Sequence, residues 1–221
     1  MKKWNTLAES ATPDGSTLTL VEHDGELLLR VNGRELMSTR RHASELRLGE
    51  AACEGLARRP RARVLIGGLG LGFTLRGALA KLGADAEVIV AELMADVVAW
   101  NRNPEWPLAA KELADPRVGV RLGDVFEALA ASSFDAIALD ADNGTTAMMT
   151  AGNRALYEAR GIARVKAALR PRGVVAFWSA VADPAFERRL GAAGFAVRNE
   201  RVRAYGHGGP WHTIIVARPT G

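Results

Sequence analysis

Short hydrophobic runs and amphipathic stretches alternate along the chain from residue 60 onward. The runs predict strands at residues 64–66, 88–91, 118–122, 134–139 and 174–178, and the stretches with helical spacing predict helices at residues 73–82, 96–101, 125–131, 156–169 and 184–193. Two more hydrophobic runs follow at residues 195–202 and 213–217. Strands that alternate with helices predict a parallel sheet, and the final pair predicts a hairpin that adds one antiparallel strand.

Residues 1–40 follow a different pattern, with hairpin-turn signals at Asp14-Gly15, Asp24-Gly25 and Asn32-Gly33. Strands predicted at residues 16–22, 27–31 and 34–37 make this region a small antiparallel β-meander. Such a meander buries little by itself, so we expect it to pack on the main domain or on a second subunit. An amphipathic helix is predicted at residues 44–57, with Ser44 as its candidate N-cap.

The predicted fold class is therefore α/β. We expect a Rossmann-like, mostly parallel seven-stranded sheet with helices on both faces and a C-terminal antiparallel hairpin, preceded by a small N-terminal β-meander. Residues 1–43 are assigned to the N-terminal antiparallel β segment and linker, and residues 44–221 to the Rossmann domain. With 221 residues, 48% of them hydrophobic, the chain is long enough to bury a sizeable core.

A glycine-rich loop follows the first predicted strand of the main domain. Its pattern is G-x-G-x-G, formed by Gly68, Gly70 and Gly72. The dinucleotide-binding pattern G-x-G-x-x-G fails, because its third glycine would fall on Phe73 or Leu75. The looser pattern is typical of folds that bind S-adenosylmethionine or a relative of it. Glu92, at the tip of the next strand, is a candidate ligand for the two hydroxyls of a ribose.

Polar and aromatic side chains gather at the carboxyl ends of the predicted strands. Ligands of open α/β sheets bind outside this edge, so we expect these residues to meet in one cleft. They are Glu92, Asp124, Asp140, Asp142, Asn143 and Trp178, with His207 and Trp211 on the loop between the last two strands. His42 and Glu45, before the main domain, either face a cleft between the meander and that domain or begin a solvated helix.

Composition narrows the classes of partner and ligand. The net charge is only +4, from 29 basic and 25 acidic residues, and the arginines are scattered, so no nucleic-acid partner is expected. Cys53 is the only cysteine, and the histidines lack the spacing of metal ligands, so we expect neither disulfides nor a metal site. The first residues lack an apolar signal core and no apolar run reaches membrane-spanning length, which favours a cytoplasmic protein without a membrane partner.

Several motifs together resemble one family. They are Gly67-Gly68 with Gly70 and Gly72, residues 88–92, Gly123-Asp124, residues 134–140 and Leu169-Arg170-Pro171-Arg172-Gly173-Val174. This set resembles the spermidine and spermine synthases, aminopropyltransferases that share the class I S-adenosylmethionine-dependent methyltransferase fold. The resemblance covers most of the chain and includes the hairpin-rich N-terminal segment.

The resemblance implies that the chain binds decarboxylated S-adenosylmethionine. Glu92 would then bind the ribose, Asp124 with its neighbour Val125 would lie at the adenine, and the glycines would line the aminopropyl tail. Asp140 matches the acidic residue that orients or deprotonates the attacking amine in the family. A small-molecule amine as substrate and a homodimer are also implied.

The sequence departs from the family pattern where the amine is recognised. The family's glycine loop carries an acidic residue, whereas Leu69, Gly70 and Leu71 stand in that region. The family's D-S-S-D-P loop is replaced by Asp140-Ala141-Asp142-Asn143-Gly144, in which the second carboxylate comes one position early. The tyrosine expected before the main domain is absent, with His42 or Ala43 near its place.

Three functional hypotheses remain. In the first, an aminopropyl group moves from decarboxylated S-adenosylmethionine to an amine, with Asp140 and Asp142 as catalytic residues and His42, Glu45, Asn143, Trp178, His207 and Trp211 as substrate-binding residues. In the second, S-adenosylmethionine itself is bound and a methyl group moves to a small molecule. The missing acidic residue in the glycine loop favours this second transfer, whereas the overall resemblance and the Asp-rich loop favour the first, which is the leading hypothesis. In the third, the chain is a non-catalytic relative that binds a nucleoside.

Overall fold

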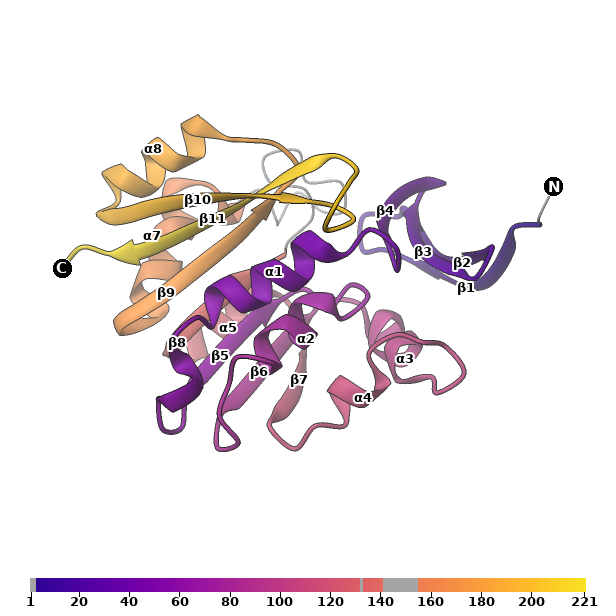
Figure 1. The fold of residues 1–221 in the computed structure, drawn as a ribbon, viewed down its shortest axis with the longest axis horizontal. Coiled ribbons are helices and arrows are strands. Elements are labelled where there is room, and N and C mark those ends of the chain that lie inside the picture. The colour runs from indigo at the N-terminus through magenta and orange to yellow at the C-terminus, as the bar shows by residue number, and fades with distance from the viewer. Residues whose placement is uncertain (1–2, 132, 141–154) are drawn as a thin grey trace.

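The computed structural model describes residues 3–131, 133–140 and 155–221, which form two β-sheets and the helices around them (Figure 1). The strands of the larger sheet are β5 (Arg63–Gly67), β6 (Glu87–Glu92), β7 (Val118–Leu122), β8 (Phe134–Leu139), β9 (Leu169–Ser179), β10 (Phe195–Arg203) and β11 (Trp211–Pro219). Their order across the sheet is β10-β11-β9-β8-β5-β6-β7. Strands β5 to β9 pair in parallel, and β11 lies antiparallel to both β9 and β10. The predicted fold class is confirmed.

Helices cover both faces of this sheet. They are α1 (Ala43–Ala52), α2 (Phe73–Leu79), α3 (Ala95–Arg102), α4 (Ala110–Leu113), α5 (Val125–Ala131), α7 (Ala159–Ala168) and α8 (Pro184–Ala192), with a short 3-10 helix at Leu56–Arg58. Alternate positions of β5 face opposite ways, so Val64 and Ile66 join one apolar cluster and Leu65 the other. The first cluster includes residues of α1, α2 and α3, and the second includes residues of α5, α7 and α8. None of the helices in the described part of the chain is long and apolar enough to cross a bilayer.

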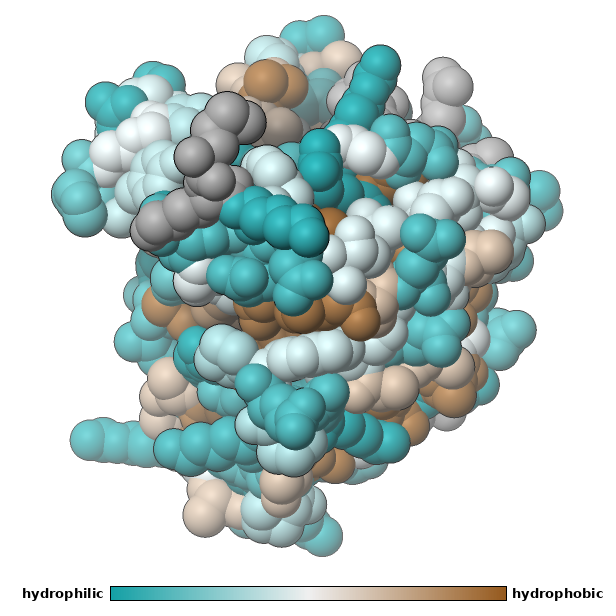
Figure 2. All heavy atoms as spheres, turned by 90° about the vertical axis from the view of Figure 1, so that its right-hand side faces the viewer, coloured by the Kyte–Doolittle hydropathy of each residue, from teal (hydrophilic) through white to brown (hydrophobic). Residues whose placement is uncertain are grey.

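The smaller sheet is the predicted meander with one further strand, β1, that was not predicted. It is formed by β1 (Asn5–Ala11), β2 (Thr17–His23), β3 (Glu26–Val31) and β4 (Arg34–Ser38) in sequence order. Asp24-Gly25 and Asn32-Gly33 have left-handed backbones at both positions, as two-residue hairpin turns require. Leu18, Leu20 and Leu29 belong to the first apolar cluster of the main domain, so the meander packs on its own chain. Seen from the meander's side, the surface is mainly hydrophilic, with a strip of hydrophobic residues near its middle (Figure 2).

Two glycines bring α1 and α2 into backbone contact. A Cβ on Gly49 of α1 would lie 2.0 Å from the carbonyl oxygen of Thr74, and a Cβ on Gly77 of α2 would lie 2.0 Å from that of Leu46. Neither position can take a larger residue without moving the helices apart. This close crossing fixes the first turn of α1 against the first turn of α2, above the carboxyl edge of the sheet.

Three local predictions were wrong. The predicted helix at residues 44–57 ends at Ala52, because Gly55 adopts a left-handed backbone and a 3-10 turn follows. Ser44 does not cap that helix: the N-cap position is His42, and the Ser44 hydroxyl contacts Glu45 and His212 instead. The fifth parallel strand begins at Leu169, not at residue 174, because Leu169 already pairs with Phe134 across a register shift.

Candidate active site

The glycine loop joins β5 to α2 and lies at the carboxyl edge of the sheet. Gly68, Gly70 and Gly72 have φ values of 92°, 52° and 82°, in the left-handed region that favours glycine. A Cβ on Gly68 would lie 2.9 Å from the carbonyl oxygen of Asp140, and one on Gly70 would lie 2.5 Å from Sδ of Met37. The loop therefore runs between the end of β8 and the meander.

Glu92 ties this loop to the end of β6. Its Oε2 accepts a hydrogen bond of 2.8 Å from the backbone N–H of Leu69, and its Oε1 accepts one of 2.8 Å from that of Met94. Burial raises the pKa of Glu92, and these hydrogen bonds oppose the rise. Each carboxylate oxygen can accept a second hydrogen bond, which is what a ribose diol would supply. Asn101, buried on α3, supports the loop by donating to the carbonyl oxygen of Gly70 over 2.8 Å.

Asp124 and Val125 lie one strand further, at the end of β7. Asp124 is exposed, and its Oδ1 accepts a 2.8 Å hydrogen bond from the N–H of Phe126 in the first turn of α5. Val125 is buried beneath the glycine loop, where a Cβ on Gly67 would lie 2.9 Å from it. Two apolar side chains at the same edge, Leu93 and Leu122, are 44% and 56% exposed, and are available to a flat ring such as adenine. These features fit an adenosyl group.

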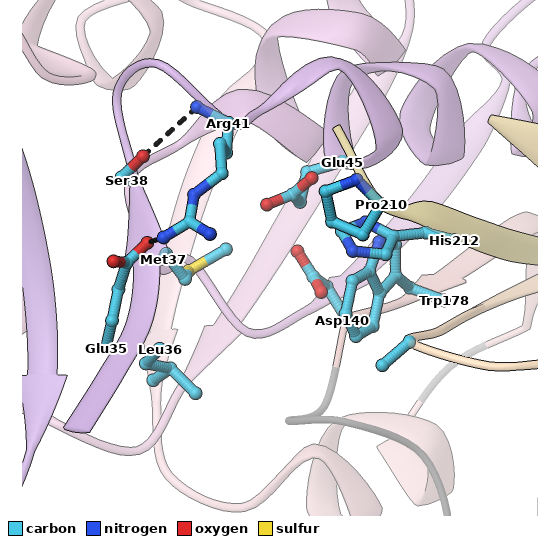
Figure 3. A pocket seen from close by; sticks show the side chains of 11 residues that line it. Glu35, Leu36, Met37, Ser38, Arg41, Glu45, Asp140, Trp178, Pro210 and His212 are labelled. Carbon is cyan, nitrogen blue, oxygen red and sulfur yellow. Dashed lines mark hydrogen bonds and ion pairs between the residues drawn. The ribbon is translucent and has the colours of Figure 1, made fainter. Parts of the chain in front are cut away.

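A cavity of about 240 Å³ lies between the meander, the start of α1 and the ends of β8 and β9 (Figure 3). It is lined by Glu35, Leu36, Met37, Ser38, Arg41, Glu45, Asp140, Trp178, Ala180, Pro210 and His212. Met37 both lines this cavity and touches Gly70, so the cavity adjoins the glycine loop. Arg41 forms an ion pair with Glu35 on the meander side.

Glu45 and Asp140 face each other across the inner end of this cavity (Figure 3). Burial, and then the nearby charge of Asp140, raise the pKa of Glu45 to about 8. Burial raises the pKa of Asp140 to about 6, against a 3.0 Å hydrogen bond from the Thr74 hydroxyl. The same hydroxyl lies 3.2 Å from the carbonyl oxygen of Glu45. Two carboxyl groups that are not readily ionised at the same time therefore meet beside the glycine loop.

His212 lies on the other side of Glu45. Its Nδ1 is 2.8 Å from the Ser44 hydroxyl, and that hydroxyl is 2.5 Å from Oε2 of Glu45. The imidazole packs edge-to-face on Trp178, with ring centroids 4.7 Å apart. Burial, and then the charge of Arg41, lower the pKa of His212. The indole N–H of Trp178 is buried and has no acceptor in the described part of the chain.

The cavity collects only some of the predicted site residues. Asp140, Glu45 and Trp178 line it, whereas His42 stacks on Phe73 with ring centroids 4.1 Å apart and does not. Two aromatic residues of the last loop also lie outside the lining: His207 is exposed, and Trp211 packs between Arg201 and Arg203. Asp142 and Asn143 lie outside the described residues. The substrate roles of His42, Asn143, His207 and Trp211 and the catalytic role of Asp142 stay predictions.

Sequence reasoning missed Thr74, His212 and the role of Ser44. Thr74 sits in a helix whose pattern reads as apolar, and His212, at the end of the loop expected at the cleft, was given no catalytic or substrate-binding role. The described residues contain no group of three or more histidine, cysteine or acidic side chains placed to hold a metal. The sequence did carry a signal for His212. Side chains alternate between the two faces of β11, so His212 lies on the face opposite to its buried neighbour Thr213.

No protein-family model matches this chain, and no curated protein matches its sequence. Its structure does match solved structures. A spermidine synthase in complex with the transition-state analogue AdoDATO superposes with a TM-score of 0.74 over 98% of this chain and 73% of the other, at 17% identity. The spermidine synthase of Thermotoga maritima gives a TM-score of 0.76 over the same shares, at 18% identity. This chain has a spermidine synthase-like fold. At these identities the likeness is one of fold, and the chemistry must be argued from the residues.

Proposed function

We propose that this protein transfers an aminopropyl group from decarboxylated S-adenosylmethionine to a small amine. The observation that carries the proposal is the pair Glu45 and Asp140, which meets in a cavity directly beside the glycine loop. An amine must be held close to the reacting carbon and must lose a proton, and paired carboxyl groups with raised pKa values suit both tasks.

The donor side of the site would be formed by the carboxyl ends of β5, β6 and β7. Glu92 has lone pairs left for a ribose diol, Asp124 and the exposed Leu122 lie where an adenine would sit, and the glycine loop leads toward the cavity. The sulfonium of the donor supplies an electrophilic carbon. Everything else that the protein contributes is placement, exclusion of water and removal of a proton.

The acceptor side would be the inner end of the cavity. At neutral pH the pair holds about one negative charge, because Asp140 titrates at about 6 and Glu45 at about 8. An ammonium group between the two carboxyls would favour their ionised forms, and Asp140 would accept or orient the proton that the amine loses. Asp142 remains the predicted electrostatic partner for the cationic substrate.

A specific observation favours methyl transfer as the second candidate. Leu69 and Leu71 of the glycine loop are 3% and 1% exposed, so this loop presents no carboxylate to the donor. Arg41 also lines the cavity, where its guanidinium could bind the carboxylate of intact S-adenosylmethionine.

The test is to incubate the purified protein with each donor and a panel of small amines, and to identify the nucleoside product by mass spectrometry. Aminopropyl transfer yields methylthioadenosine, and methyl transfer yields S-adenosylhomocysteine. Calorimetric titration with both donors and methylthioadenosine accompanies the assay. Binding without turnover would leave a non-catalytic nucleoside-binding protein, and no binding at all would remove the proposal.

A further inference from the structure

Glu45 is connected to His212 by one buried hydroxyl. Ser44 is fully buried, and its Oγ lies 2.5 Å from Oε2 of Glu45 and 2.8 Å from Nδ1 of His212. A serine hydroxyl can donate one hydrogen bond while it accepts another, so this arrangement can work in either direction. The three groups come from the first turn of α1 and from β11, which are 168 residues apart at the Ser44–His212 contact.

A route for protons away from Glu45 matters because Glu45 itself has little access to water. The residue is 5% exposed, and an amine seated between Glu45 and Asp140 would occupy the cavity through which a proton could otherwise leave. His212 is only half-buried and lies nearer the surface, on the strand that follows the exposed hairpin loop. It can therefore exchange protons with solvent while Glu45 cannot.

We propose that Ser44 and His212 form a proton relay that carries protons from Glu45 to solvent during the transfer reaction. This inference rests on the proposed function. In the relay the Glu45 carboxyl gives its proton to Ser44 Oγ while the Ser44 hydroxyl gives its own proton to His212 Nδ1. His212 then releases the proton on Nε2 to solvent, and exchange of the imidazole tautomer together with rotation of the Ser44 hydroxyl restores the starting state. Two O–H bonds and one N–H bond break, one O–H bond and one N–H bond form within the chain, and solvent takes the remaining proton. Glu45 is left as a carboxylate that can take over the next proton that Asp140 accepts from the amine.

The charges around His212 suit this role. Arg41 and Glu35 from the meander side, Glu45 from α1 and Asp140 from the end of β8 line the same cavity as His212. Burial, and then the charge of Arg41, disfavour the protonated imidazole. His212 therefore begins the cycle neutral, with Nδ1 free to accept, and does not retain the proton it receives. Packing on Trp178 holds the ring in the orientation that directs Nδ1 at Ser44.

The experiment measures steady-state transfer by the wild-type protein and by Ser44→Ala, His212→Ala and the double variant. Cutting the relay at either place has the same consequence, so we expect each single variant and the double variant to lose about 10-fold in kcat, with KM for the amine unchanged. Added imidazole should restore kcat to His212→Ala in a saturable manner but not to Ser44→Ala. Ser179→Ala is the matched control: this serine is also buried near the same edge, but within the described part of the chain its hydroxyl bonds only the carbonyl oxygen of Val181.

Four outcomes overturn the relay. They are unchanged kcat in the single variants, losses that multiply in the double variant, imidazole rescue of neither or both single variants, and an equal loss in Ser179→Ala. Melting temperatures of all variants separate these results from unfolding. If the wild-type protein transfers no group to any amine, the proposed function fails and the relay falls with it. If the wild-type protein transfers the group and the variants have unchanged kcat, the relay is disproved but the proposed function stands.

Discussion

Strand β8 carries an aspartate at each end, and the fold surrounds the two in opposite ways. Asp135, near its start, is fully buried and lies 2.6 Å from Arg59 and 2.9 Å from Arg170. Asp140, just past its end, forms no ion pair within the described residues, and burial raises its pKa to about 6. A carboxylate that is paired on both sides holds structure together, whereas one left without a cation is available to a cationic ligand.

Strand β6 repeats the contrast. Glu87, at its amino end, is more than half exposed and pairs with Arg63 over 2.8 Å. Glu92, at its carboxyl end, is buried and accepts backbone hydrogen bonds that shape the glycine loop. At the amino edge Asp135 and Glu87 are thus paired with arginines, whereas Asp140 and Glu92 at the carboxyl edge have no arginine partner among the described residues. Ligands of open α/β sheets bind outside this second edge.

The largest expected effect is on turnover, from Asp140→Asn. The amide keeps the size of the side chain and can still accept from Thr74, but it cannot take a proton from an amine. We expect kcat to fall by about 100-fold or more, with donor affinity unchanged and stability unchanged or higher. Product formation and calorimetric titration check this in parallel. A variant with full turnover would show that Asp140 has no role in proton removal.

At the other end of β8, Asp135→Asn should do the reverse. Arg59 and Arg170 would lose their charged partner, but both are about one-third exposed and can be partly rehydrated. We expect a loss of about 2 kcal/mol in the free energy of unfolding and about 5 °C in melting temperature, with kcat unchanged. Chemical denaturation with an activity assay tests both parts. An unchanged melting temperature would mean that the two arginines contribute no stability through Asp135.

For β6, Glu92→Gln should weaken donor binding. The amide presents one NH₂ group to a backbone N–H that now donates to a carboxylate, and it loses the charge that favours ribose hydroxyls. We expect about 10-fold weaker binding of the donor and of methylthioadenosine. Glu87→Gln is the control on the same strand, and its exposed ion pair is worth at most about 1 kcal/mol. Equal affinities in the two variants would remove Glu92 from the ribose site.

A smaller effect concerns stability and pH. The folded protein raises the pKa of Glu45 from an ordinary carboxyl value to about 8, so the folded state binds a proton that the unfolded state has released. This contribution is present below the unfolded pKa and is lost as pH rises toward 8. We expect the free energy of unfolding to fall as the pH rises from the pKa of Glu45 in the unfolded chain to its pKa of about 8 in the folded protein. In Glu45→Gln this fall should be smaller by more than about 1 kcal/mol. Parallel pH dependence in both proteins would contradict the raised pKa.

The sequence predicts the sheet far better than the site. The strands at 118–122 and 134–139 and the helix at 125–131 have the predicted bounds, because Gly123-Asp124 and Asp140 mark the ends of the two strands in the sequence. The start of β9 could not be predicted, since it depends on pairing with Phe134 across a register shift. Thr74 meets Glu45 where α1 and α2 cross closely at Gly49 and Gly77, a packing that periodicity does not encode.

The most direct test of the account is a titration of the Glu45 and Asp140 carboxyls by ¹³C NMR, with Glu45→Gln and Asp140→Asn to assign the signals. In the free protein both apparent pKa values should lie well above the ordinary carboxyl range, near 8 and 6, because burial and mutual repulsion act on the pair. Adding butane-1,4-diamine with methylthioadenosine should lower both values, since an ammonium between the carboxyls favours their ionised forms. If both groups titrate in the ordinary range, and the diamine leaves them unchanged, the cavity does not hold the proposed pair and the account is contradicted.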